Sequence, residues 1–190
     1  DEKSTIYYID FSFDKLRLGG SAFAQSLNKI GDDVPTVQNP EYFRDAFLEV
    51  QELVNKGLIM AGHDISAGGL ITTLLEMCFS NMEGGMEISL NKIKEDDIIK
   101  ILFAENPGIV IQVKNKHKEE VKKILEDAGI GYVKLGKPTE ERHILVEKGD
   151  ATYQFGIDYL RDVWYSTSYL LDCKQSMNGC AKKRFENYKK

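Results

Sequence analysis

The chain has 190 residues, of which 42% are apolar and 29% are charged, and its net charge is -5 at pH 7. This length and composition are typical of one globular domain, and the acidic balance argues against a nucleic-acid surface. No apolar run approaches the ~20 residues of a membrane span, and the first residues lack the apolar segment of a signal peptide. We therefore expect a soluble domain that binds neither nucleic acid nor a membrane.

The first elements predicted along the chain are a strand and two helices. Residues 6–13 alternate like a strand, and the loop after them ends in Gly19-Gly20 before a short helix at 21–27. Asn39-Pro40 then predicts a helix start, because asparagine caps a helix and proline fits its first position. Gly57 predicts the end of this second helix.

The next segment predicts a strand, a tight turn and a helix. Residues 58–64 are apolar on both faces, which is typical of a central strand. They lead through a turn at 63–69 into the helix 70–79, which is apolar nearly all round and is expected to be buried. The segment repeats the layout around Gly19-Gly20, so the chain has two glycine turns that each join a strand to a helix.

The C-terminal half predicts a mixed α and β region. The order strand, helix, strand, strand within residues 108–147 indicates a ferredoxin-like piece. We expect Asp158 to cap a last long helix, and the basic tail after it to be solvated. Expected strands lie at 86–90, 108–113, 132–135, 143–147 and 152–155, and expected helices at 96–103 and 118–128.

The three cysteines indicate a reducing compartment. Cys78 lies in the apolar helix and is interpreted as a buried small hydrophobe. Cys173 and Cys180 carry no CxxC spacing, and nothing requires a disulfide between them. The sequence therefore predicts a cytoplasmic location and shows no zinc pattern.

The turn after residue 63 combines groups that bind phosphate and metal. Backbone N–H groups at a helix start attract anions, and Gly68 and Gly69 would let a ligand approach them. The carboxylate of Asp64 could hold the Mg²⁺ that phosphates bring, with Ser66 beside it. The alternative is structural: Asp64 or Ser66 caps the helix, and the glycines permit close packing.

Three further polar residues have open interpretations. Glu76 lies among apolar neighbours, so it needs a partner, a metal, or a position that water reaches. Glu105 could cap a helix, reach the same end of the sheet, or be a solvated loop acid. For His63, a structural hydrogen bond is favoured over a general base because no nucleophile lies near it in sequence.

An ordered set of motifs resembles the C-terminal half-domain of the aminoimidazole ribonucleotide synthetase superfamily, and within it the phosphoribosylformylglycinamidine synthases. The resemblance covers essentially the whole chain, and its specificity comes from the order of the motifs. The motifs are Leu18-Gly19-Gly20-Ser21-Ala22, His63 to Leu70, Glu76-Met77, Leu102 to Gly108 with Val110 to Val113, Leu160 to Trp164 with Thr167-Ser168-Tyr169, and Cys180-Ala181.

The resemblance implies an α+β fold: a three-layer α/β/α domain with a mixed sheet and partial ferredoxin-like topology. It implies that residues 1–178 form the second C-type domain of the long, single-chain enzyme. Residues 179–190 would then be a linker toward a glutaminase domain. The implied partners are the other synthetase domains and the glutaminase domain of a parent chain.

The resemblance also implies the parent reaction and the roles of residues. The parent converts formylglycinamide ribonucleotide, glutamine and ATP into the amidine, ADP, phosphate and glutamate. Asp64 matches an aspartate that reaches Mg²⁺ on bound ATP or ADP. The residues expected to face the nucleotide phosphates are Gly19, Gly20, Ser21, Ser66, Gly68 and Gly69.

Ala67 stands where family members usually have a second acid, and alanine can neither bind metal nor accept a proton. We therefore expect no catalytic residue in this chain and no activity of the chain alone. One alternative is a structural or assembly domain that binds no ligand. Another is an aminoimidazole ribonucleotide synthetase or a selenophosphate synthetase, against which Trp164 and Thr167-Ser168-Tyr169 argue.

Overall fold

The centre of the protein is a seven-stranded mixed sheet with the order β2-β4-β1-β5-β3-β6-β7. The computed structural model describes residues 3–187. Neighbouring strands are antiparallel except β3 and β6, which are parallel. The strands are β1 (Ser4–Asp10), β2 (Ile59–Asp64), β3 (Gly85–Ser89), β4 (Gly108–Lys114), β5 (Tyr132–Thr139), β6 (His143–Lys148) and β7 (Ala151–Gly156).

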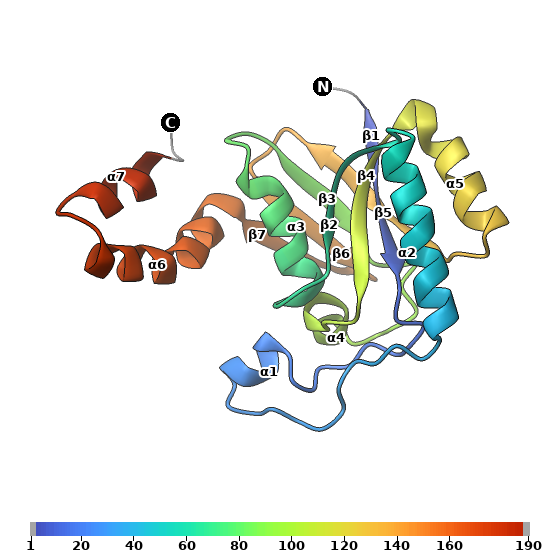
Figure 1. Cartoon of the computed structure of the whole chain (residues 1–190), viewed down its shortest axis with the longest axis horizontal. Coiled ribbons are helices and arrows are strands. Elements are labelled where there is room, and N and C mark those ends of the chain that lie inside the picture. The colour runs from blue at the N-terminus through green and yellow to red at the C-terminus, as the bar shows by residue number, and fades with distance from the viewer. Residues whose placement is uncertain (1–2, 188–190) are drawn as a thin grey trace.

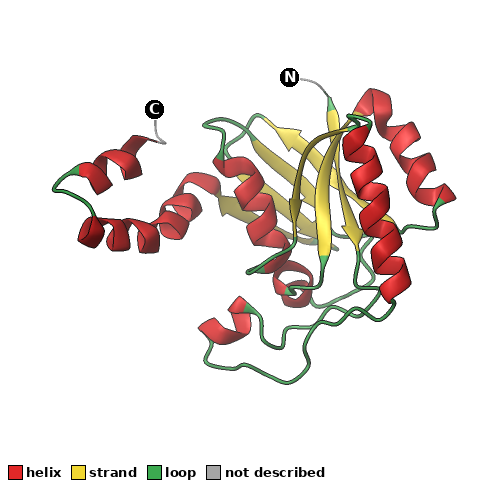
Figure 2. Cartoon of the chain, viewed as in Figure 1, coloured by secondary structure: helices red, strands yellow, loops and turns green. Residues whose placement is uncertain are grey.

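Helices cover both faces of this sheet and make three layers, as the sequence predicts (Figures 1 and 2). On one face α2 and α5 bury residues such as Val50 and Leu125 against Ile111 of β4. On the other face α3, α4 and the first turn of α6 form a second core around Leu74 and Ile88. The helices are α1 (Ala22–Ser26), α2 (Pro40–Asn55), α3 (Gly69–Phe79), α4 (Ile98–Phe103), α5 (Lys118–Asp127), α6 (Ile157–Gln175) and α7 (Cys180–Asn187), with a 3₁₀ turn at Asn115–His117.

The ferredoxin-like piece is a split β-α-β unit. The strand β1 pairs antiparallel with both β4 and β5, so these two strands are parallel with β1 between them. The helix α5 makes the crossover from β4 to β5. This arrangement confirms the partial ferredoxin-like topology.

Local signals define the long helix as expected. Asn39 accepts hydrogen bonds from the backbone N–H groups of Glu41 and Tyr42, and Pro40 is the first helical residue. Gly57 follows the helix with a φ of +67°, which favours glycine. Seven of the 11 residues of α3 are buried, among them Leu74 and Cys78, which confirms the prediction of a buried helix.

Two predictions about position are wrong. The strand β2 lies at an edge of the sheet, because its one neighbour is β4, and Met60 is 44% exposed. Its apolar composition therefore does not reflect burial within this chain. Asp158 lies in the first turn of α6 and is not its cap; the N-cap residue is Gly156. The carboxylate of Asp158 instead pairs with Arg142 and Arg161.

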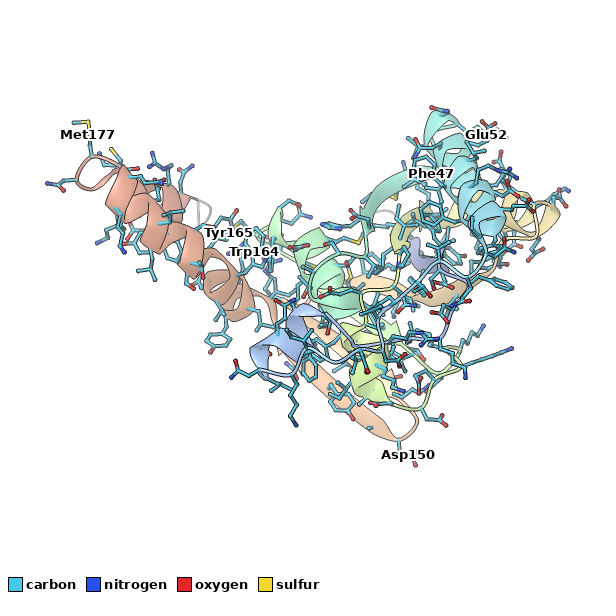
Figure 3. All side chains as sticks on the ribbon, turned by 60° about the horizontal axis from the view of Figure 1, so that its bottom comes forward. Phe47, Glu52, Asp150, Trp164, Tyr165 and Met177 are labelled. Carbon is cyan, nitrogen blue, oxygen red and sulfur yellow. The ribbon has the colours of Figure 1, made fainter. Side chains whose placement is uncertain are left out.

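The last two helices form an arm that leaves the body of the protein (Figures 1 and 3). The helix α7 folds back on α6, because the ring of Phe185 packs on Tyr169 and Arg184 pairs with Asp172. This helix occupies most of the predicted linker 179–190, of which residues 188–190 lie outside the described part. Cys78, Cys173 and Cys180 are free thiols. Within residues 3–187, no helix is long and apolar enough to cross a membrane.

Candidate functional site

The candidate site lies where β2 ends and α3 begins. Asp64 is the last residue of β2, and its side chain is 77% exposed. Its Oδ1 lies 3.6 Å from Nδ1 of His63, and its backbone carbonyl accepts a hydrogen bond from Thr73 Oγ1 at 3.0 Å. Ser66 and Ala67 follow in the exposed part of the turn. The carboxylate of Asp64 is thus held on an ordered backbone and faces solvent.

The backbone at this turn adopts conformations that favour glycine at both Gly68 and Gly69. Gly68 is the N-cap residue of α3 with φ +91°, and Gly69 has φ +70°. A Cβ on Gly69 would lie 2.7 Å from the carbonyl oxygen of Leu102 and 2.8 Å from that of Ala104. The N–H of Gly69 donates to the carbonyl of Ser66 at 3.0 Å. Close packing of α3 on the end of α4 therefore requires glycine here, whatever else the turn does.

The other glycine turn lies in the loop of residues 11–39, which carries α1 and which we call the α1 loop. The N–H of Gly19 donates to the carbonyl of Asp33 at 2.9 Å, and that of Gly20 to Ile30 at 2.8 Å. Ser21 caps α1 by accepting from Ala24 N–H, and its hydroxyl donates to the carbonyl of Leu18. These groups close the α1 loop on itself.

Glu105 connects the two glycine turns. Its Oε1 accepts a hydrogen bond from the N–H of Ala22 at 2.7 Å and another from the N–H of Gly68 at 2.8 Å. Two of the three interpretations of Glu105 are confirmed: it caps the start of a helix, and it lies at the same end of the sheet as the turn after His63. Glu105 lies in a loop and is half-buried, but it is more than a solvated loop acid, because its Oε1 accepts from two N–H groups at the starts of helices.

Residues on either side of Glu105 strengthen the same connection. The ring of Phe103 stacks on Phe23 of α1 with centroids 4.7 Å apart. The amide of Asn106, which is 1% exposed, donates to Ser12 Oγ and to the carbonyl of Lys15. Sequence reasoning missed Asn106. The only signal was its place in the Leu102 to Gly108 motif, because its partners lie about 90 residues away.

Glu76 finds its partner in His63. The Nε2 of His63 lies 3.1 Å from Glu76 Oε2, and its Nδ1 lies 2.8 Å from the backbone carbonyl of Asp64. A carbonyl and an ionised carboxylate both only accept, so His63 is the donor in these contacts, through whichever ring nitrogen carries the proton. The structural interpretation of His63 is therefore confirmed, and Glu76 is held beside the site.

Charged groups in the α1 loop shape its electrostatics. A hydrogen bond from Arg17 lowers the pKa of Asp14 to about 2, with help from Lys15 N–H and Thr36 Oγ1. Arg17 also pairs with Asp33, so one guanidinium links Asp14 in the first part of the α1 loop to Asp33 in its last part. Nearby, burial raises the pKa of the Tyr8 hydroxyl, and Asp10 adds to this shift. Ion pairs as well as backbone hydrogen bonds therefore hold the α1 loop in place.

The site offers one exposed carboxylate to a metal. Within residues 3–187 there is no group of three His, Cys, Asp or Glu side chains that could hold an ion. Mg²⁺ is usually bound through one or two carboxylates together with phosphate oxygens and water. Asp64 therefore fits a magnesium that arrives with phosphates, and it does not fit a metal held by this chain alone.

A comparison with protein families gives one match over most of the chain. The family described as AIR synthase related protein, C-terminal domain, matches residues 6–148. The match ends before β7 and the arm of α6 and α7, and it includes both glycine turns and Glu105.

Two curated proteins that match nearly the whole chain share about a third of its residues. The human phosphoribosylformylglycinamidine synthase is 34% identical over 179 residues, which are 92% of this chain and 13% of the human protein. The probable chloroplastic/mitochondrial enzyme of Arabidopsis thaliana is 32% identical over 97% of this chain and 13% of its own length. The chain thus spans about an eighth of these relatives.

Solved structures share the fold. Thermotoga maritima PurL complexed with ATP has a TM-score of 0.63 and 14% identity, and it covers 84% of this chain and 26% of that one. The complex of the same protein with FGAR has a TM-score of 0.65 and 17% identity, with 84% and 28% covered. These neighbours confirm the α+β fold with helices on both faces of a mixed sheet.

Proposed function

The chain belongs to the AIR synthase related protein family as a C-terminal domain, and from this premise we propose that it is one domain of a phosphoribosylformylglycinamidine synthase. In that role the whole parent chain would use ATP and glutamine to convert formylglycinamide ribonucleotide into its amidine. The proposal is supported by 34% identity to the human enzyme over 92% of this chain. The full reaction needs domains outside these 190 residues.

Within the parent, this domain would complete a site for the phosphates of a magnesium-bound nucleotide. The observation that carries this proposal is the exposed carboxylate of Asp64 at the end of β2, where an ordered turn leads into α3. Asp64 would bind Mg²⁺ together with phosphate oxygens, and Ser66 would contact the same phosphates. When bound, the metal would neutralise phosphate charge. Ala67 supplies no second acid, so the domain would complete a site without catalysing a step.

The glycine turns would take part only after a change in their hydrogen bonds. In the structure the N–H groups of Gly19, Gly20 and Gly69 donate to backbone carbonyls, and that of Gly68 donates to Glu105. A phosphate would reach the N–H groups of Gly19, Gly20 and Gly69 by displacing their carbonyl acceptors, and it would lie beside Gly68 while the N–H of Gly68 keeps its bond to Glu105. The same observation favours the second candidate function, a structural domain that packs against the other domains of the parent and binds no nucleotide.

Asp64→Ala in the parent enzyme separates the two functions. If Asp64 binds magnesium, the purified variant retains less ADP and Mg²⁺ than the wild type while its fold is unchanged. Asp150→Ala is the matched control, because Asp150 lies at the tip of the β6–β7 turn, at the far edge of the sheet from β2 (Figure 3). Unchanged ADP and Mg²⁺ in Asp64→Ala would establish the structural function instead.

Three finer assignments belong to the same proposal. Residues 1–178 would be the second C-type domain, and residues 179–190, including α7, would lead toward a glutaminase domain. The partners would be the other synthetase domains and that glutaminase domain. The compartment would be the cytoplasm, whereas the name of the Arabidopsis relative gives chloroplast and mitochondrion.

A further inference from the structure

We infer that Glu105 is a positioning residue that fixes the distance between the two glycine turns of the candidate phosphate site. This inference rests on the proposed function, and it assigns a role to a residue that the magnesium proposal does not use. Its starting point is one oxygen atom, Oε1 of Glu105, which accepts from the N–H groups of both Ala22 and Gly68.

The two donors come from distant parts of the chain. Ala22 begins α1, and Gly68 is the N-cap residue of α3. Hydrogen bonds from backbone N–H groups to a carboxylate are shorter and stronger than those between neutral groups, and the bonds here measure 2.7 and 2.8 Å. Because both donors share one acceptor atom, neither turn can move relative to the other without breaking one of these bonds.

Glu105 itself is held by its neighbours. Ala104 before it is 4% exposed and Asn106 after it is 1% exposed. The N–H of Phe11 donates to the carbonyl of Pro107, and that of Ile65 donates to the carbonyl of Gly108. The backbone of residues 104–108 is therefore anchored to the ends of β1 and β2, which gives the Glu105 side chain a rigid base.

Other contacts keep the α1 loop in place if the carboxylate is removed. Phe23 stacks on Phe103, and Asn106 bonds to Ser12 and Lys15. We therefore expect Glu105→Ala to loosen the spacing of the two turns without unfolding the domain. The charge on Glu105 would oppose a nearby phosphate, so its effect on nucleotide binding comes through geometry and not through direct contact.

Amide hydrogen exchange on the 190-residue chain tests the local part of the inference. In Glu105→Ala the exchange rates of the Ala22 and Gly68 amides should both rise, by about tenfold for the loss of one hydrogen bond. Glu105→Gln keeps an oxygen acceptor at Oε1 and should restore most of the protection. Asp150→Ala should change neither amide. A rise at only one amide, or at neither, would overturn the inference.

ADP retention by the parent enzyme tests the functional part. Glu105→Ala should lower the amount of ADP that copurifies with the enzyme. Glu105→Gln keeps the oxygen acceptor but loses the charge, and it should restore most of the ADP. If the negative charge itself were what matters, Glu105→Gln would not restore it. ADP that is unchanged or increased in Glu105→Ala would overturn the inference, and an increase would mean that the carboxylate occupies an anion site. Circular dichroism shows whether Glu105→Ala folds. If it does not fold, Glu105→Gln decides the test: its ADP content should be close to that of the wild type, and a low content would overturn the inference.

The variant Asp64→Ala keeps the two proposals distinguishable. Lower ADP in Asp64→Ala with normal ADP in Glu105→Ala would overturn the positioning role alone. Normal ADP in both variants would overturn the magnesium-nucleotide function itself, and with it the role of Glu105 in that site.

Discussion

The Nε2 of His63 lies 3.1 Å from Glu76 Oε2 and joins the end of the edge strand β2 to the middle of α3. The side chains are 30% and 19% exposed, so the contact is partly shielded from water. This contact explains how α3, which has seven buried residues, accommodates the carboxylate of Glu76 on the side that faces His63.

We expect this pair to contribute measurably to stability. A double-mutant cycle with His63→Ala and Glu76→Ala should give a coupling of about 1 kcal/mol in denaturant unfolding, because exposed pairs give less and fully buried ones more. The matched control is His117 with Glu120, whose atoms lie 3.7 Å apart and whose carboxylate is 55% exposed. Equal coupling in the two pairs would contradict the expected effect of burial.

Alanine at Gly69 should be far more harmful than alanine at Gly149. Both glycines have positive φ, at +70° and +58°, so both substitutions carry the cost of about 1–2 kcal/mol for a left-handed residue. Only Gly69 also brings a Cβ to 2.7 Å from a backbone oxygen, whereas nothing lies within 4 Å of the Cβ position at Gly149. We expect Gly69→Ala to lower the free energy of unfolding by more than about 3 kcal/mol. Similar losses at both positions would show that α3 can shift away from α4.

Asp14 gives the stability of the domain a defined dependence on pH. The hydrogen bond from Arg17 lowers its pKa from 3.8 to about 2 in the folded protein. A lowered folded pKa stabilises the fold above the unfolded pKa, and this stabilisation is lost as the pH falls through about 2. The free energy of unfolding of Asp14→Asn should therefore lie below that of the wild type at pH 5, and the difference should shrink between pH 4 and pH 2. A difference that is constant over this range would contradict the assignment.

Local signals in the sequence predict the helices and strands well, but they do not predict how the strands are ordered in the sheet. The cap at Asn39 and the apolar run of α3 depend on neighbouring residues, so they could be read from the sequence. The edge position of β2 could not, because an apolar strand pattern reports what faces a strand and not how many strands pair with it. An edge strand with exposed Met60 looks in sequence like a central one.

The candidate site divides in the same way. The glycine turns and Asp64 could be found from composition and spacing within one segment. A capping role of Glu105 could also be named from the sequence. The partners of Glu105 and Asn106 could not, because they lie 37 to 94 residues away and depend on how β1, β2 and β4 meet at one end of the sheet. Long-range polar contacts of this kind carry no periodic signal.

The arm of α6 and α7 is joined to the body through the first two turns of α6, where Ile157 enters the core and Trp164 packs on Phe79. Ile157 is fully buried and belongs to the same core as Leu74, whereas Val163 is 51% exposed on the same helix. Ile157→Ala should lower the free energy of unfolding by about 2–4 kcal/mol because it removes buried methyl groups. Val163→Ala should change it by less than about 0.5 kcal/mol, since exposed positions contribute little. Denaturant unfolding of the two variants checks this contrast, and a large loss in Val163→Ala would mean that the outer face of α6 is packed against another surface in solution.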